Sequence, residues 1–177
     1  AASSLGLFVG GVDADAAGPR LRCYSLDDFS LALESDAFEE SDLDGIAVSP
    51  DESALYAAAW AVDHEIVCLD PTTLAERFRF GRGRFRGAWD LAVCGDEVFV
   101  ADHGGHKLQV FSLSGEHRRD ITGGFWCPDR LLHFDGRLYV VENRYAEPNG
   151  ISEEEEAKLG TRIFVLMPQG ETLQVYD

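Results

Sequence analysis

The sequence lacks the segments and motifs that would place it in several common functional classes. No apolar run approaches the roughly 18 residues that a membrane-spanning helix needs, and no stretch resembles a secretory signal peptide. The 177 residues contain no nucleophile elbow, P-loop, dinucleotide-binding fingerprint, HExxH pair or zinc-finger pattern. We therefore expect no membrane contact, no cofactor and no catalysis of its own. We expect the protein to be located in the cytoplasm or another intracellular compartment.

Cysteines and basic residues are also sparse. The four cysteines, Cys23, Cys68, Cys94 and Cys127, lie at least 26 residues apart, so no CxxC metal pair exists. Two of them fall in apolar segments, where a free thiol acts as a small hydrophobe, and we expect reduced structural thiols. Lysine and arginine total 15 against 32 acidic residues, a net charge of −17. Because binding to phosphate backbones is driven by basic surface, this balance disfavours general nucleic-acid binding.

What the chain does contain is a repeated apolar segment. The stretch 88–113 reads as three short strands that are rich in Val, Phe and Leu and separated by polar or glycine turns. Partial copies recur through the chain, most visibly as an aromatic residue in the second strand at Phe8, Tyr56, Phe99 and Tyr139, with steps of 48, 43 and 40 residues. This period is typical of β-propeller blades.

The other strands follow the same order in each copy. Shorter first strands are expected at 45–48, 90–93 and 130–133, and second strands at 6–11, 55–60, 98–103 and 138–143. Third strands are expected at 21–26, 65–70, 107–113 and 162–167, and fourth strands at 29–34, 75–80, 116–121 and 172–177. Nearly every strand is apolar on both alternations, as a sheet buried on both faces requires. We predict an all-β fold of four-stranded antiparallel blades.

The predicted blades form one region, residues 1–177. Their boundaries fall at about 1–42, 43–87, 88–125 and 126–177. Only the five residues AASSL precede the strand at 6–11, so the first blade is expected to lack its innermost strand.

A family resemblance is carried by particular residues. The stretch VFVADHGGHKLQVFSLSGE (98–116) resembles the NHL repeat, and the connections at 78–93 and 121–132 look like the glycine-rich NHL loops, the second with Pro128. The resemblance covers about residues 43–177 and departs from the pattern at AAAWAVDHE and ENRYAEPNG. It implies a propeller that is usually six-bladed. We therefore expect part of a larger propeller, with a closed four-bladed ring or completion by another chain as the alternatives.

In propellers that resemble this chain, ligands usually bind on the face where second strands turn into third strands. Our leading hypothesis is a protein-interaction scaffold that binds through these turns. The candidate binding residues are Asp63, His64, His103, His106, Asn143 and Arg144. An acidic insertion at 144–160, with SEEEEAKL predicted as a helix, could guide a basic partner. The His103 and His106 pair could instead bind a metal, or His106 could simply pack within its repeat.

Two further functions remain open as alternatives. The resemblance to six-bladed hydrolases implies a calcium or zinc ion held by Asp102, Glu142 and Asn143 in a hydrolase or lyase, although these residues could instead cap strand ends. The segment RFRFGRGRFRG (77–87) resembles an RGG-like segment and gives Arg82, Arg84 and Arg86 as candidates for binding single-stranded RNA. Its phenylalanines also fit positions that anchor a loop.

Overall fold

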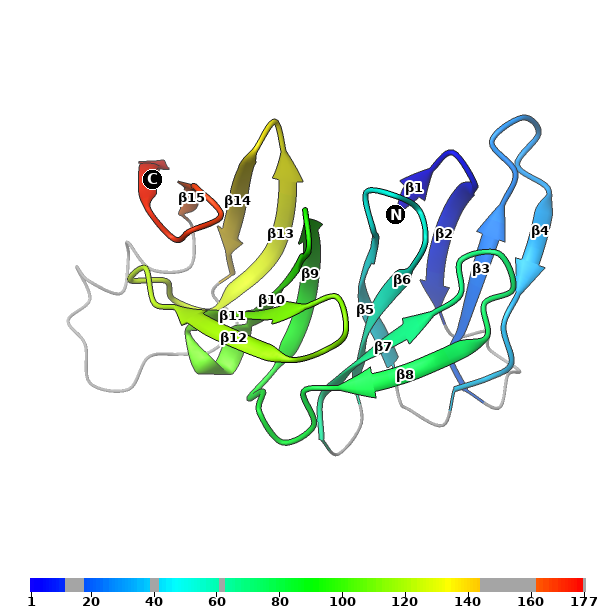
Figure 1. Cartoon of the computed structure of the whole chain (residues 1–177), viewed down its shortest axis with the longest axis horizontal. Coiled ribbons are helices and arrows are strands. Elements are labelled where there is room, and N and C mark those ends of the chain that lie inside the picture. The colour runs from blue at the N-terminus through cyan, green and yellow to red at the C-terminus, as the bar shows by residue number, and fades with distance from the viewer. Residues whose placement is uncertain (12–17, 39–41, 61–62, 144–161, 177) are drawn as a thin grey trace. The chain divides into compact units, whose positions relative to one another are not determined.

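The protein is described by a computed structural model. It describes residues 1–11, 18–38, 42–60, 63–143 and 162–176, and these form sixteen β-strands and one short 3-10 helix (Figure 1). The strands make four sheets of four, each antiparallel and each in sequential order. The predicted all-β class and the four-stranded blades are confirmed. The expected helix at 144–160 lies outside the described residues.

The chain divides into two compact units, residues 1–88 and 89–177, each holding two sheets. In the first unit, sheet 1 comprises β1 (Ala2–Ser3), β2 (Gly6–Gly11), β3 (Arg20–Tyr24) and β4 (Leu31–Glu34). Sheet 2 comprises β5 (Asp42–Val48), β6 (Leu55–Trp60), β7 (Glu65–Leu69) and β8 (Glu76–Phe80). That the whole chain forms one region stays a prediction.

In the second unit, sheet 3 comprises β9 (Ala88–Cys94), β10 (Glu97–Asp102), β11 (Lys107–Ser112) and β12 (His117–Ile121). Sheet 4 comprises β13 (Pro128–Phe134), β14 (Arg137–Glu142), β15 (Ile163–Leu166) and β16 (Thr172–Tyr176). The 3-10 helix η1 (His103–Gly105) joins β10 to β11. All four predicted second strands match the observed ones to within one residue.

The first sheet corrects one expectation. Its innermost strand is present as β1, a strand of two residues that pairs with β2, whereas the other three sheets begin with strands of seven residues. The pairing continues to the terminus, since the amide of Phe8 donates to the carbonyl of Ala1 at 2.6 Å and the Ala1 amino group donates back at 2.8 Å. The sequence AASS has neither β-branched nor aromatic residues, so it gives no strand signal.

Each sheet has two apolar faces because side chains alternate along its strands. We call the face that carries the second-strand aromatic (Phe8, Tyr56, Phe99 or Tyr139) the aromatic face, and the opposite face the aliphatic face. In the second unit, Phe99, Ala101, Leu108 and Val110 on the aromatic face of sheet 3 share one core with Leu138, Val140, Phe164 and Leu166 on the aliphatic face of sheet 4. In the first unit, Phe8, Leu21 and Cys23 of sheet 1 share a core with Leu55, Ala57, Val67 and Leu69 of sheet 2.

We predict that Phe8→Ala destabilises the protein by about 3–5 kcal/mol, because truncation of a buried aromatic leaves a cavity. Phe8 is 1% exposed and sits in the core of the first unit. Phe29→Ala is the matched control, since Phe29 is 67% exposed. This substitution should change the free energy of unfolding by no more than about 0.5 kcal/mol. The measurement is urea unfolding followed by fluorescence. Equal effects of the two substitutions would contradict the assigned core.

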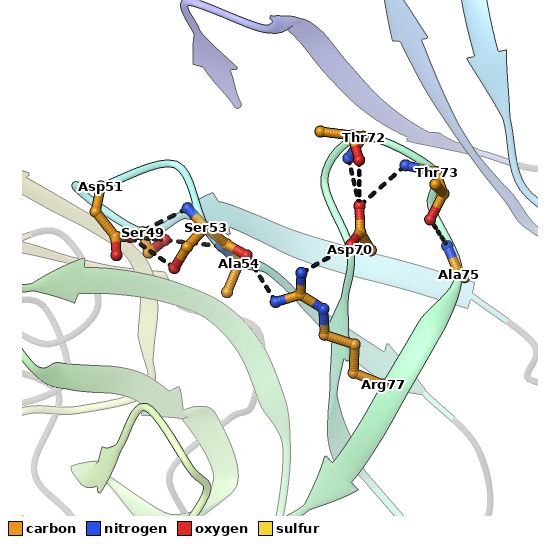
Figure 2. Close-up of polar contacts among 9 residues, drawn as sticks. All are labelled: Ser49, Asp51, Ser53, Ala54, Asp70, Thr72, Thr73, Ala75 and Arg77. Carbon is orange, nitrogen blue, oxygen red and sulfur yellow. Dashed lines mark hydrogen bonds and ion pairs between the residues drawn. The ribbon is translucent and has the colours of Figure 1, made fainter.

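Two turns of sheet 2 are fixed by carboxylates and joined by one arginine (Figure 2). Asp51 accepts hydrogen bonds from the Ser49 hydroxyl at 2.6 Å and from the Ser53 amide at 3.1 Å. Asp70 accepts bonds from the Thr72 hydroxyl and amide at 2.6 and 2.8 Å. Arg77 then donates to Asp70 at 2.8 Å and to the Ser53 carbonyl at 2.6 Å, which links the β5–β6 turn to the β7–β8 turn. Local bonds of this kind replace the backbone pairing that a turn lacks.

These bonds favour the charged carboxylates and therefore make the turns sensitive to acid. The bond from Ser49, followed by those from Ser53, lowers the pKa of Asp51 to about 2. Its contribution to stability is present above the unfolded pKa near 4 and is lost as the pH falls to about 2. We expect Asp51→Asn to lower the melting temperature at pH 7, with the difference from wild type shrinking between about pH 4 and pH 2.

The control is Asp27→Asn, which removes an equal charge from an exposed position. If the Asp51→Asn difference did not change with pH, the hydrogen bonds from the serines would not be what fixes this turn.

Candidate functional site

The turn between β10 and β11 carries both histidines of the HGGH motif. The strand β10 ends at Asp102, whose Oδ2 accepts a bond of 2.8 Å from Gln109 Nε2, and both side chains are almost completely buried. A Cβ on Gly105 would lie 2.2 Å from that same oxygen, so glycine is required there. The turn closes at His106, in the left-handed conformation with φ 54°. The buried Asp102 carboxylate therefore stabilises the turn by packing against Gly105 and accepting a hydrogen bond from Gln109.

Each histidine of this turn stacks on a different tryptophan. The His103 ring lies 4.2 Å from Trp89, and the His106 ring lies 4.3 Å from Trp126, at interplanar angles of 12° and 18°. His106 Nδ1 also accepts a hydrogen bond of 3.2 Å from the Cys127 amide. The Cys127 carbonyl in turn accepts a bond of 3.1 Å from the Asn143 amide. His106 thus holds the connection between sheets 3 and 4, as its packing interpretation predicts.

His103 is buried rather than displayed on the surface. It is 7% exposed, and its Nε2 makes no hydrogen bond within the part of the chain that the structure describes. Burial lowers the pKa of His103 below its usual value, and the nearby negative charge of Asp129 opposes this shift only in part. The imidazole is consequently neutral at pH 7.

Two aspartates at the starts of the innermost strands were missed by the sequence reading. Asp90 Oδ2 accepts a bond of 2.9 Å from the Leu131 amide, which ties β9 to β13. Burial raises the pKa of Asp90. Asp129 is 6% exposed, with its Oδ2 3.4 Å from Arg130. The only sequence signal was an Asp beside a Trp or Pro before each apolar strand, in WDLAV and PDRLL.

Glu142 anchors the loop that leads into sheet 4. Its side chain has no exposed surface, and Arg162 donates to both of its oxygens, from Nε at 2.9 Å and from Nη2 at 2.8 Å. The Trp126 amide donates to the same carboxylate, and Arg162 also reaches the Gly124 carbonyl at 3.1 Å. This arrangement matches the capping interpretation of Glu142.

The metal alternative gains no support from this geometry. Arg162 places a positive charge on both oxygens of Glu142, and Gln109 engages Asp102, so a cation would have to displace these donors. Among the described residues, no group of three or more His, Cys, Asp or Glu side chains is arranged to hold a metal ion. The calcium or zinc site at Asp102, Glu142 and Asn143 stays a prediction.

In the first unit, the turn between β6 and β7 displays a tryptophan. Trp60 ends β6 and is 46% exposed, and its ring stacks on His64 at 5.7 Å with an interplanar angle of 13°. Asp63 is exposed, and its Oδ2 lies 3.6 Å from Arg82 Nε. The sequence analysis named His64 and Asp63 but assigned no role to Trp60.

The arginine-rich loop is held by its phenylalanines. Phe80 and Phe85 are both 8% exposed, and Gly81, at φ +80°, would place a Cβ 2.3 Å from the Phe85 ring. The anchoring role proposed for these phenylalanines matches this burial. Arg77 and Arg79 bind carboxylates of their own sheet, Asp70 in one case and Glu65 and Glu76 in the other. The side chains at the three RNA-candidate positions are exposed: Arg82, Arg84 and Arg86.

The candidate binding residues thus fall in different places. Asp63 and His64 belong to the first unit, whereas His103, His106 and Asn143 belong to the second. The structure brings the last three together around the loop at Cys127. Arg144 and the acidic insertion lie outside the described residues. No described segment is a helix long and apolar enough to cross a membrane.

Comparison with known families and structures agrees with this geometry. The NHL repeat matches residues 85–111, which span the start of sheet 3 and the HGGH turn. The chain is built of β-propeller blades, one of them an NHL repeat. No curated protein sequence matches this propeller chain.

Solved structures share the blade architecture at low sequence identity. Hydrazine synthase from Kuenenia stuttgartiensis is 14% identical over 88% of this chain and 42% of that one, with a TM-score of 0.66. A chain of a nidogen/laminin complex is 12% identical over 89% and 55%, with a TM-score of 0.69. Glutaminyl cyclase from Myxococcus xanthus is 15% identical over 90% and 62%, with a TM-score of 0.60. The chain therefore spans about half the length of these structures, and the likeness shows the fold.

We predict that Glu142→Ala destabilises the second unit by about 3–5 kcal/mol, because it leaves the partly buried Arg162 charge and the Trp126 amide without their shared partner. Hydrogen exchange at the Trp126 amide should accelerate at the same time, since that amide donates to Glu142. Glu171→Ala is the control, as Glu171 is exposed in the β15–β16 turn. Stability unchanged by Glu142→Ala would show that the carboxylate is not an anchor.

Proposed function

We propose that this NHL-type propeller chain is a binding module for a protein partner, without catalysis of its own, and that the turn after β6 is its contact site. The observation that carries the proposal is the exposed Trp60, backed by His64. Tryptophan is among the residues that most often dominate the energy of protein interfaces. A large aromatic that is almost half exposed at a turn therefore suits the role of an anchor for a partner.

The surroundings of Trp60 have the composition of an interface. His64 lies parallel to the indole and restricts its rotation, so little side-chain entropy remains to be lost on binding. Asp63 and Arg82 form a solvent-exposed pair, with side chains 53% and 75% exposed. An apolar anchor with a charged rim is the usual anatomy of a specific interface. The partner expected from this chemistry inserts an apolar or aromatic side chain beside the indole and offers polar groups to the rim.

The histidines of sheet 3 contribute less to this proposal than the sequence suggested. His103 is buried against Trp89, and His106 is used to hold the loop at Cys127. The candidate contact residues of this site are therefore Trp60, Asp63, His64 and Arg82, all in the first unit. Asn143 and Arg144 stay predictions of the sequence analysis. Enzymes occur among the structures with similar blades, as glutaminyl cyclase shows, so the non-catalytic role rests on the site and not on the fold.

The test is quantitative affinity capture with the wild-type chain and Trp60→Ala as baits, followed by titration of each captured protein. Removal of an anchor of this kind costs at least about 2 kcal/mol, so the affinity for a true partner should fall about 30-fold. Phe29→Ala is the matched control, because it removes an exposed aromatic elsewhere in the same unit. Partners that bind Trp60→Ala and wild type equally would contradict the proposal.

A parallel arm addresses RNA. If the arginine loop were the contact site, the chain would bind single-stranded RNA with an affinity that falls steeply as salt rises. This binding would be lost on substitution of Arg82, Arg84 and Arg86 by Ala, and Trp60→Ala would not change it.

A further inference from the structure

One sheet face in the second unit is apolar and uncovered. On the aromatic face of sheet 4, Leu132 is 59% exposed, Phe134 65%, Val141 36%, Ile163 39% and Tyr176 50%. These side chains share one face because the register pairs Val141 with Ile163, Ile163 with Tyr176, and Leu132 with Tyr139. Every described residue of the edge strand β16 is exposed as well. Contiguous apolar surface of this kind marks an interaction site more often than a solvated face.

The same positions are buried in the neighbouring repeat. The repeat register equates Ala92 with Leu132, Ala101 with Val141, Leu108 with Ile163 and Ile121 with Tyr176. The four sheet 3 residues are between 0% and 5% exposed, and they pack in one core with the aliphatic face of sheet 4. The aromatic face of sheet 4 thus repeats a packing surface and lacks the sheet that would cover it.

The complementary surface is on sheet 1. Its aliphatic face carries Leu7, Val9, Arg22 and Tyr24, which the register pairs as Leu7 with Tyr24 and Val9 with Arg22. They correspond to Leu55, Ala57, Val67 and Leu69 of sheet 2, which receive the aromatic face of sheet 1. Val9 is 42% exposed, and Arg22 is neutralised by Glu34 at 2.7 Å. Three of the four positions are apolar, so this face is fit to receive another aromatic face.

We propose that the aromatic face of sheet 4 packs on the aliphatic face of sheet 1 of a second copy of this chain. The contact repeats the interface already present inside each unit, between sheets 1 and 2 and between sheets 3 and 4. The interface is heterologous, because it joins two different surfaces of the same chain.

The net charge sets the salt dependence of this association. Each copy carries −17, so the two copies repel each other at low ionic strength. Salt screens this repulsion without weakening apolar packing, and association should therefore strengthen as salt rises.

Sedimentation equilibrium on the whole chain tests the proposal. Wild type should sediment at twice the 19.5 kDa chain mass or a higher multiple. The associated fraction should be larger at about 0.5 M than at about 0.05 M salt, between which the Debye length changes roughly 3-fold. Ile163→Glu and Val9→Glu should each reduce association. An equimolar mixture of the two variants should associate again, because one keeps sheet 4 intact and the other keeps sheet 1 intact.

Several outcomes would overturn this inference. A wild-type chain that stays at 19.5 kDa at all concentrations would show that no second copy covers the face. Association that is lost in Ile163→Glu but kept in Val9→Glu would show that sheet 4 pairs with itself. Tyr176→Glu, on the edge strand, replaces Ile163→Glu if that variant does not fold. Trp60→Ala should leave the mass unchanged, which separates this contact from the proposed partner site.

Discussion

Burial of both faces of every sheet is the constraint on which the rest of this structure depends. A single four-stranded sheet with Phe, Leu and Val on both alternations cannot be stable in water, because each face exposes apolar surface until another sheet covers it. Within each unit the chain meets this requirement for one face of each sheet, by packing an aromatic face on an aliphatic face. The same contact occurs in both units. The aliphatic face of sheet 1 and the aromatic face of sheet 4 are of the same two kinds and stay exposed.

The polar residues near the sheet ends are best understood through the same constraint. Packing two sheets face to face requires connections that cross from one to the next, and their backbone groups need partners. His106 supplies one for the Cys127 amide, Glu142 for the Trp126 amide, and Asp90 for the Leu131 amide. Charged and titratable side chains thus gather where a catalytic or metal site is expected in a propeller, while their hydrogen bonds serve the connections.

The three tryptophans show how a structural element acquires a binding role. Each stacks on a histidine, as Trp89 with His103, Trp126 with His106 and Trp60 with His64. The two pairs in the second unit are tied into the sheet connections, whereas Trp60 is the most exposed apolar side chain of sheet 2. The same stacking that rigidifies a loop in one repeat presents a rigid, half-exposed aromatic in another.

The sequence by itself determined the repeat, the four-strand order and the positions of the second strands, because the period of about 40–48 residues and the recurrent aromatic are local signals. It also predicted the anchoring phenylalanines of the arginine loop. It missed β1, whose two residues have no strand signal, and it missed Asp90, Asp129 and the exposure of Trp60. Burial and pairing depend on what lies opposite a residue in space. A histidine reads the same in sequence whether an indole covers it or solvent does, and only the tertiary structure decided that His103 is buried while Trp60 is displayed.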